Sequence, residues 1–318
     1  MLNPKSKIQN LKSNITEREN PASIELDTKP TREILRIINQ EDHKVAAAVS
    51  RGIPQIARAV DLIVKALERG GRMVYIGAGT SGRLGVLDAA ECIPTFGTES
   101  VVAVMAGAPR AMFKPVEGIE DDTGQAVRDL RRLKLSRRDV VVGISASGRT
   151  PYTLGGLGYA RKLRARTVAV TNNPHAEMSK LADVTISAVV GPEVIAGSTR
   201  MKAGTAQKLI LNMLSTASMV RLGRVFSGWM VNVRMNNEKL KKRGQDMLAT
   251  GAGVSPGVAR RTLEEAGWNL PVAFLMLWKG ISRREAVSTL RLGKNPAAVL
   301  RRARAEWATS LALSRDSA

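Results

Sequence analysis

The sequence predicts an α/β fold, a five-stranded parallel sheet flanked by helices, with a small C-terminal all-helical domain. The first observation is a series of short β-rich runs: Met73–Ile76, Val101–Met105, Val140–Ile144, Thr167–Thr171 and Val184–Ser187. The second is that stretches long enough for crossover helices, such as Tyr152–Leu163, separate these runs. The third is a repeat of short amphipathic patterns over Val258–Leu313. Strands that alternate with helices form a parallel sheet covered on both faces.

The remaining segments suggest how the chain is divided. Residues 1–15 are polar, and we expect a disordered tail there. Helical patterns cover Thr31–Asn39 and Asp42–Arg69, the second with a break at Gly52-Ile53-Pro54. A long apolar helix is expected from Gly204 to about Val220, and a linker at Gly251–Gly257. We therefore predict a catalytic domain over 16–248 and a helical domain over 249–318.

Composition narrows the class of protein. The chain has 318 residues, 44% of them hydrophobic, which is enough to bury a sizeable core. Its single cysteine, Cys92, cannot form an internal disulfide, and this fits a reducing compartment. We see no signal peptide at the N-terminus, and the longest apolar stretch, near Val272–Trp278, is far too short to span a membrane. We expect a cytoplasmic protein with no membrane partner.

The formal net charge of +21 allows three interpretations. The first is a charged, solvated surface, the second is steering of an anionic substrate, and the third is nucleic-acid binding. Aromatic residues, which stack on bases, make up only 3% of the chain, and the charge is spread along it. We favour the solvated surface and do not expect a nucleic-acid partner.

The first informative loop runs from Ile76 to Arg83, between a strand and a helix. Gly77, Gly79 and Gly82 match the G-x-G-x-x-G pattern of dinucleotide sites. No acidic residue ends the next strand to hold a ribose, and Arg83 stands where a P-loop requires lysine. The candidate binding residues of this first loop are Gly79, Thr80 and Ser81.

A second loop, Gly143–Pro151, also follows a strand and precedes a helix. It shares Ser-Gly-Arg with the first loop. Hydroxyl groups and backbone N–H groups at a helix N-terminus suit a phosphate monoester. The alternative is ordinary N-capping by Ser and Thr, but two such loops without a nucleotide signature favour phosphate. The candidate residues are Ser145, Ser147, Gly148, Arg149 and Thr150.

A third segment, residues 193–208, leads into the long apolar helix. It combines hydroxyls, cations and an acid, and its alternative is a capped helix with surface lysines. Ser198 and Thr199 could contact a substrate, and Lys202 or Lys208 could neutralise an anion. The candidate residues of the third segment are Glu193, Ser198, Thr199, Lys202 and Lys208.

Two further acids stand out, Glu91 in an apolar stretch and Glu120 in an acidic one. Taken alone, each is better explained as an ion-pair or capping residue than as a catalytic acid. With one cysteine and two widely separated histidines, His43 and His175, the sequence predicts neither a zinc site nor a Ser-His-acid triad.

Together these motifs resemble the sugar isomerase (SIS) family of phosphosugar-binding domains, and within it the N-acetylmuramic acid 6-phosphate etherases. The similar motifs extend from about Thr16 to Arg243, and two of them mark the etherase branch: Leu87-Asp88 followed by Glu91, and the run Gly197–Lys208. The resemblance implies an SIS-type, flavodoxin-like three-layer sandwich, a homodimer, and no metal or cofactor.

The resemblance also implies a reaction. The lactyl ether of the phosphosugar would be cleaved by elimination followed by addition of water, which requires two differently poised carboxyl groups. Glu91 matches the family's proton donor, and Glu120 its second acid, the base.

The sequence departs from the family at three positions. Ala90 and Ala196 stand where Ser and Thr are usual, and Asn232 where Asp is usual. The segment between Glu91 and Glu120 is also about two residues shorter than in typical members. Two alternatives stay open, a non-catalytic sugar-phosphate regulator and another phosphosugar isomerase or lyase.

Overall fold

The computed structural model of the chain describes residues 15–293 and 295–316, with side chains up to residue 310. The predicted disordered tail over 1–15 therefore lies outside the described residues, except for Ile15, which begins the 3-10 turn η1 (Ile15–Glu17). The chain forms two compact units. The first comprises 1–90 and 100–216, and we call it the sheet unit; the second comprises 91–99 and 217–318, and we call it the helical unit.

The sheet unit contains five parallel strands in the order β2-β1-β3-β4-β5. This order is that of flavodoxin-like sheets, and all five predicted strands are confirmed within one residue. The strands are β1 (Met73–Gly77), β2 (Val101–Met105), β3 (Val140–Ile144), β4 (Arg166–Thr171) and β5 (Val184–Ser187).

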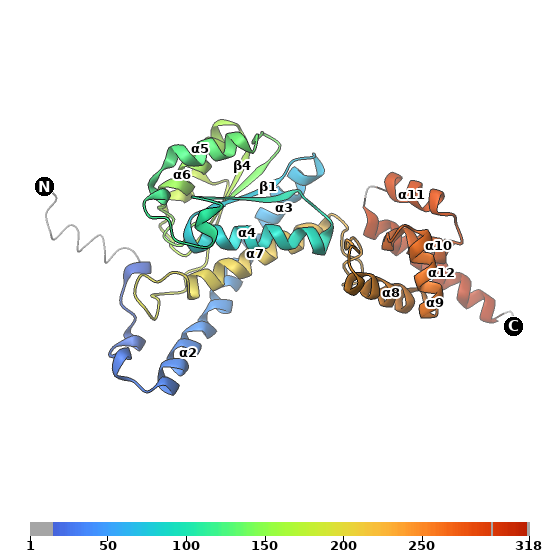
Figure 1. Cartoon of the computed structure of the whole chain (residues 1–318), viewed down its shortest axis with the longest axis horizontal. Coiled ribbons are helices and arrows are strands. Elements are labelled where there is room, and N and C mark those ends of the chain that lie inside the picture. Colours follow the sequence, from blue (N-terminus) through green and yellow to red (C-terminus); the bar gives the residue numbers. More distant parts are fainter. Residues whose placement is uncertain (1–14, 294, 317–318) are drawn as a thin grey trace, which may run out of the picture. The chain divides into compact units, whose positions relative to one another are not determined.

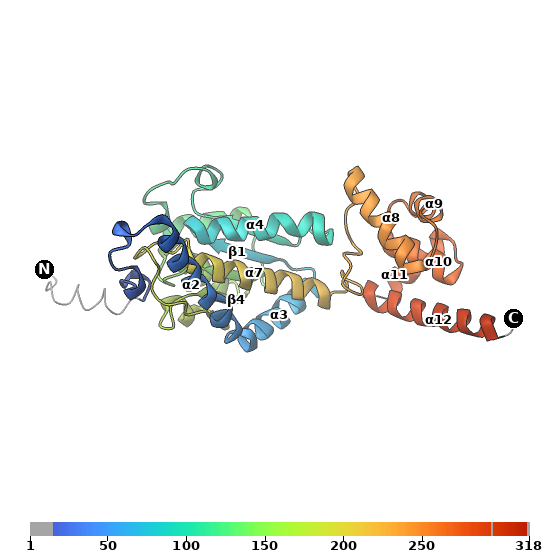
Figure 2. The same cartoon turned by 90° about the horizontal axis from the view of Figure 1, so that it is seen from below.

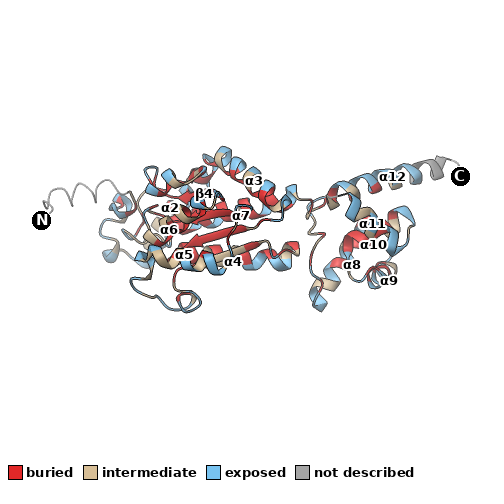
Figure 3. Ribbon diagram, turned by 90° about the horizontal axis from the view of Figure 1, so that it is seen from above, coloured by how far each residue is buried: buried red, intermediate tan, exposed pale blue. Residues whose placement is uncertain are grey.

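Helices cover both faces of the sheet, so the predicted three-layer sandwich is confirmed. Helices α5 (Thr123–Arg132) and α6 (Pro151–Lys162) cover one face (Figure 1). The other face carries α3 (Ile53–Glu68), α4 (Gly79–Phe96) and α7 (Lys202–Arg221) (Figure 2). Every residue of β1 and β3 is buried (Figure 3), as expected for central strands that are covered on both sides.

The N-terminal helices differ from the prediction in one respect. Helix α2 (Thr31–Ser50) is continuous where two helices were expected, because no helix breaker occurs between Thr31 and Ser50. The expected break does occur at Gly52, and Pro54 occupies the first turn of α3, where its missing N–H costs nothing. The short 3-10 turns of the sheet unit are η2 (Pro21–Ser23), η3 (Leu26–Thr28), η4 (Arg110–Met112), η5 (Ile119–Asp121) and η6 (Glu177–Leu181).

The helical unit packs around an aromatic core. Phe274 stacks on Trp278 with a centroid distance of 4.4 Å, and Phe226 packs against both rings. Side chains of Asn237, Ser255, Asn269 and Ser282 cap four of its helices. The helices are α8 (Glu238–Ala252), α9 (Pro256–Glu265), α10 (Leu270–Lys279), α11 (Arg283–Leu292) and α12 (Pro296–Asp316).

The expected linker at Gly251–Gly257 is short, because α8 continues to Ala252 and α9 begins at Pro256. Helix α8 packs on α9 and α10, so it lies in the same unit as the C-terminal helices. A separate domain over 249–318 stays a prediction. In the described part of the chain, no helix combines the length and the apolar character needed to cross a membrane.

Candidate functional site

The first and second loops meet at one edge of the sheet. Strands β1 and β3 are neighbours, and Gly77 at the end of β1 pairs with Ile144 at the end of β3. The strand order reverses direction at this point, because β1 also pairs with β2. In open α/β sheets the ligand crevice lies at such a switch point, outside the carboxyl ends of the strands.

The first loop makes a tight turn from β1 into α4. A Cβ on Gly77 would lie 3.0 Å from the backbone nitrogen of Gly82 and from the carbonyl oxygen of Ile144. Gly79 has a φ of +53°, which favours glycine. These glycines let α4 start directly at the end of the strand. The loop therefore presents the first N–H groups of α4, which have no intrahelical partner, at the carboxyl edge.

The second loop is held by its own hydroxyl groups. The buried Ser145 Oγ accepts a hydrogen bond of 3.0 Å from the Gly148 N–H and lies 2.8 Å from Thr150 Oγ1. Gly148 has a φ of +69°, and a Cβ there would lie 2.2 Å from the Cβ of Ala176. Ser147 is half-buried, and its Oγ accepts from the Arg149 N–H at 3.3 Å. Ser145 thus shapes the loop, whereas Ser147 keeps a hydroxyl proton to donate.

The N-terminus of α6 offers further donors. Its N-cap residue, Thr150, makes no capping hydrogen bond with its side chain, and Pro151 follows. The N–H groups of the first turn are therefore not used by the cap. An uncapped helix start next to several hydroxyl groups is a suitable place for a phosphate group.

The start of α7 is already occupied by an acid. The buried carboxylate of Glu193 accepts hydrogen bonds from the backbone N–H groups of Lys202 at 3.0 Å and Ala203 at 2.9 Å. Burial raises the pKa of Glu193, although these two N–H groups oppose the shift. Glu193 therefore acts as a helix cap in this structure. Because its carboxylate uses the N–H groups at the start of α7, we expect an anion to bind at the starts of α4 and α6 instead.

The two lysines of the third segment lie in different surroundings. Lys202 is 1% exposed, and its Nζ lies 2.5 Å from Glu41 Oε2, so its charge is already paired inside the protein. Lys208 is exposed and donates to Asn212 Oδ1 at 2.8 Å. Ser198 and Thr199 are partly exposed and precede α7.

Three buried polar side chains join these segments, and the sequence predicts no role for two of them, Gln207 and Asn172. Ser81 Oγ donates to Gln207 Oε1 at 2.9 Å, and Gln207 Nε2 donates to Asn172 Oδ1 at 3.1 Å. The Asn172 N–H in turn donates to the Ala146 carbonyl at 3.0 Å. A signal existed for Asn172, because polar residues directly after a buried strand lie at the carboxyl edge of the sheet.

Glu120 lies near the start of α6. It is exposed in η5, and η5 packs against α6. A Cβ on Gly155, in the second turn of α6, would lie 2.6 Å from the carbonyl oxygen of Thr123. The chain just after Glu120 therefore runs beside the first turns of the helix that follows the second loop.

Glu91 lies on α4, ten residues beyond Ser81, which corresponds to about 15 Å along the helix axis. Its side chain is exposed, although its neighbours in the sequence are apolar. Leu87, one turn earlier on the same face of α4, is also exposed, at 47%.

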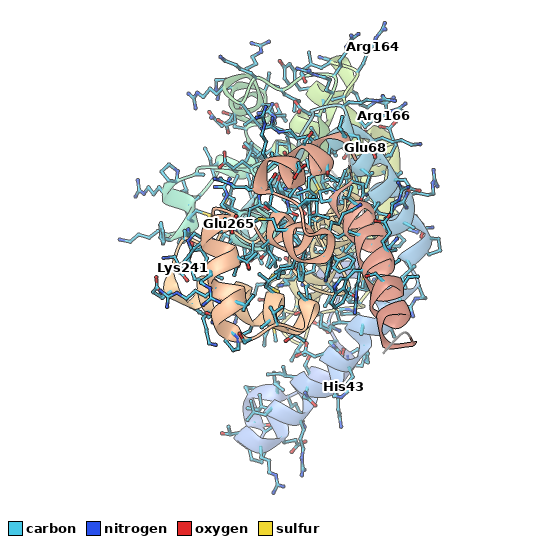
Figure 4. All side chains as sticks on the ribbon, turned by 90° about the vertical axis from the view of Figure 1, so that its right-hand side faces the viewer. His43, Glu68, Arg164, Arg166, Lys241 and Glu265 are labelled. Carbon is cyan, nitrogen blue, oxygen red and sulfur yellow. The ribbon has the colours of Figure 1, made fainter. Side chains whose placement is uncertain are left out.

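Neither histidine belongs to this arrangement. His43 is exposed on α2 and points away from the sheet (Figure 4), and His175 is exposed after β4. Within residues 15–293 and 295–316, no group of three or more His, Cys, Asp or Glu side chains is placed to hold a metal ion.

Two domain families match parts of the chain. The glucokinase regulatory protein N-terminal SIS domain matches residues 55–161, and the SIS domain matches residues 121–217. Among solved structures, the chain is similar to a phosphoheptose isomerase from Francisella tularensis, with a TM-score of 0.47 and 19% identity over 58% of this chain and 98% of that chain.

Whole-chain relatives are much closer in sequence. An N-acetylmuramic acid 6-phosphate etherase of Actinobacillus succinogenes is 50% identical over 89% of this chain and 94% of its own length. The etherase of Edwardsiella ictaluri is 51% identical over 88% and 94%, and that of Aeromonas hydrophila 49% over 88% and 95%. The resemblance inferred from the motifs is therefore confirmed, and the chain belongs to the N-acetylmuramic acid 6-phosphate etherase family.

Proposed function

We propose that the chain cleaves the D-lactyl ether of N-acetylmuramic acid 6-phosphate and so yields N-acetylglucosamine 6-phosphate and D-lactate, in the recycling of cell-wall amino sugars. The observation that carries this proposal is the identity of about 50% to etherases over most of the chain. The site geometry agrees with it, because the first and second loops bring hydroxyl groups and free helix N–H groups to one point that suits a phosphate monoester.

The reaction proceeds by elimination from the open-chain aldehyde. A base first removes the proton on carbon 2, and the electron pair of that bond is held as an enolate with the aldehyde carbonyl. The pair then forms a double bond to carbon 3 as the bond from carbon 3 to the lactyl oxygen breaks. An acid gives the departing lactate oxygen its proton. Water then adds, with hydroxide at carbon 3 and a proton at carbon 2. Only protons and electron pairs move, so no redox cofactor is required, and the enzyme is a carbon–oxygen lyase.

Two carboxyl groups carry out the proton transfers of the elimination. Glu120 is the base at carbon 2, and its segment lies beside the helix that follows the second loop. Glu91 is the acid that protonates lactate. The two roles require opposite protonation states at the start of the reaction, and this favours two carboxyl groups in different surroundings.

The phosphate is bound by the first and second loops. Thr80, Ser147 and Thr150 offer hydroxyl groups, and Gly79, Ser81 and the first turn of α6 offer backbone N–H groups. The Ser81 hydroxyl and the N–H groups of Gly148 and Arg149 already donate hydrogen bonds within the protein. Arg149 is exposed and can also bring a guanidinium to the anion. Ser198 and Thr199, which precede α7, and Lys208 on α7 suit the sugar hydroxyls or the lactyl carboxylate.

The active form is a homodimer in the cytoplasm. Leu87 on α4 and Met213 on α7 are 47% and 37% exposed, and a second copy of the chain would cover such apolar side chains. Leu87→Lys should convert the dimer to a monomer in a light-scattering experiment at micromolar concentration. An unchanged mass would remove this face from the interface.

The decisive experiment uses the purified chain and N-acetylmuramic acid 6-phosphate. We expect stoichiometric D-lactate, and in ¹⁸O-labelled water the label should enter the hydroxyl on carbon 3 of the sugar and not lactate. In heavy water, deuterium should enter at carbon 2. A chain that binds the phosphosugar but releases no lactate would instead be a sugar-phosphate-binding regulator.

A further inference from the structure

A buried ion pair links the N-terminal helix α2 to the start of α7. Lys202 Nζ lies 2.5 Å from Glu41 Oε2, and the two side chains are 1% and 5% exposed. Lys44, which is 60% exposed, contacts the other oxygen of Glu41 from the solvent side. Burial would raise the pKa of Glu41, but hydrogen bonds from Lys202, Lys44 and Asn20 outweigh it and lower the pKa to about 2. Glu41 is therefore ionised at neutral pH.

Such a pair has little advantage in stability over uncharged side chains in both positions. Desolvation of two charges offsets most of their attraction, and an apolar pair of similar volume often does as well. A buried pair does fix one relative position of the elements that carry it, because each charge is costly without its partner. The partners here are 161 residues apart in the sequence.

The element that this pair fixes forms one wall of the candidate site. Lys202 is the first residue of α7. Two residues later, a Cβ on Gly204 would lie 3.4 Å from Thr80 Cγ2, and in the second turn Gln207 accepts the hydrogen bond of Ser81. The first turns of α7 thus lie directly against the first loop.

Residues near the N-terminus also hold the segment that precedes α7, residues 192–201. Asn20 Nδ2 donates to the Pro192 carbonyl at 3.0 Å, and the Gly197 N–H donates to the Thr16 carbonyl at 3.1 Å. Both ends of the segment that carries Ser198 and Thr199 are therefore attached to residues that precede the sheet.

We propose that Glu41 is a positioning residue for substrate binding: through Lys202 it holds the first turns of α7 against Thr80 and Ser81, so that the first loop is preformed for the phosphate group. This proposal rests on the proposed function, because it names the site that Glu41 supports. It also assigns Lys202 to the support of the site and not to direct contact with the anion.

The test compares Glu41→Gln, Lys202→Met and the double variant with the matched control Lys44→Met, which removes only the exposed partner of Glu41. Calorimetry gives the Kd for N-acetylglucosamine 6-phosphate, kinetics give kcat and KM, and thermal scans give Tm. We expect Glu41→Gln to raise Kd and KM about 10- to 100-fold while kcat changes less than about 3-fold, because the two catalytic acids are untouched. Glu41→Asp should recover part of the affinity.

The double variant separates positioning from simple stability. It removes both charges, so its Tm should return toward that of the wild type while Kd stays high. The proposal is overturned if Glu41→Gln lowers Tm but leaves Kd within 2-fold, or if Lys44→Met weakens binding as much. It is also overturned if Lys202→Met weakens binding and Glu41→Gln does not, because Lys202 would then contact the anion itself. If the wild type releases no lactate but Glu41→Gln still weakens its binding of the sugar phosphate, only the proposed function is refuted.

Discussion

Ser81 at the start of α4 donates a hydrogen bond of 2.9 Å to the side-chain oxygen of Gln207 on α7, and both side chains are buried. Gln207 in turn donates a hydrogen bond from its side-chain nitrogen to Asn172, which follows β4. One amide thus joins the first loop to α7 and to the chain after β4. Its two hydrogen bonds use its oxygen and its nitrogen separately, so substitutions can remove them one at a time.

Gln207→Ala should therefore lower the free energy of unfolding by about 1–3 kcal/mol, the usual cost of leaving buried polar groups without a partner. It should also weaken phosphosugar binding, because Ser81 loses its anchor. Gln207→Glu can still accept from Ser81 but cannot donate to Asn172, and we expect an intermediate affinity. Urea unfolding and calorimetry measure the two effects. Thr205→Ala, on the exposed side of α7, is the control and should leave the affinity unchanged; equal losses in both variants would contradict the prediction.

Most of the fold can be predicted from the sequence, because central parallel strands are buried on both faces and appear as short apolar runs. Val140–Ile144 is such a run, and the structure places a strand there with the same bounds. The first and second loops could be assigned to one edge, since strands that alternate with helices run parallel and all end on the same side.

The contacts between distant segments could not be predicted. Nothing in the sequence near Lys202 indicates that its side chain is buried against Glu41, because that depends on where α2 packs. Glu91 shows the reverse problem. Its neighbours are apolar, but consecutive residues of a helix point in different directions, and its side chain is exposed.

Glu91→Gln and Glu120→Gln should separate the two halves of the reaction. Without the acid, the lactate leaving group departs poorly, so lactate release should fall about 10²–10⁴-fold while exchange of the carbon 2 proton with heavy water continues. Without the base, both exchange and release should be lost. Proton NMR follows exchange, and a coupled assay follows lactate. Normal lactate release by Glu91→Gln would remove Glu91 from this role, and continued exchange by Glu120→Gln would remove Glu120.

Ser147 and Ser145 should respond differently to alanine. Ser147→Ala removes a donor to the phosphate and should weaken binding of the sugar phosphate by about 1.5–3 kcal/mol, with Tm unchanged. Ser145→Ala removes the acceptor that holds the Gly148 N–H, so we expect Tm and affinity to fall together. Calorimetry with the phosphorylated and the unphosphorylated sugar is the measurement. Equal affinity of the wild type for the two sugars would argue against phosphate recognition at this loop.

Acidic pH should lower the free energy of unfolding, partly because Glu41 becomes protonated. The pKa of Glu41 is lowered from 4.5 to about 2 in the folded chain, so the folded state favours the carboxylate. The stabilisation is fully present above pH 4.5 and disappears as the pH falls through 2, and it amounts to about 3 kcal/mol. The difference in unfolding free energy between the wild type and Glu41→Gln should therefore shrink between pH 4.5 and pH 2. A difference that is constant over this range would mean that Glu41 has no depressed pKa.

The net charge of +21 is the feature that the proposed reaction explains least. Residues 249–318 carry 11 Lys and Arg against 5 Asp and Glu, a share that their length accounts for. Arg301, Arg302 and Arg304 are exposed on α12, which makes them suitable for neutralisation without loss of packing. If their field gathers the substrate, which bears a phosphate and a carboxylate, it acts on encounter, and thus on kcat/KM and not on kcat.

We expect the triple variant with Gln at these three positions to keep both kcat/KM and its dependence on salt. Between about 0.05 and 0.5 M salt the Debye length shortens roughly threefold, so kcat/KM of the wild type should still fall, because direct phosphate contacts are screened as well. A shallower salt dependence in the triple variant would show instead that the C-terminal charge steers the substrate. A loss of retention on duplex DNA without any kinetic change would indicate that α12 binds polyanions, and the solvated-surface interpretation would then be wrong.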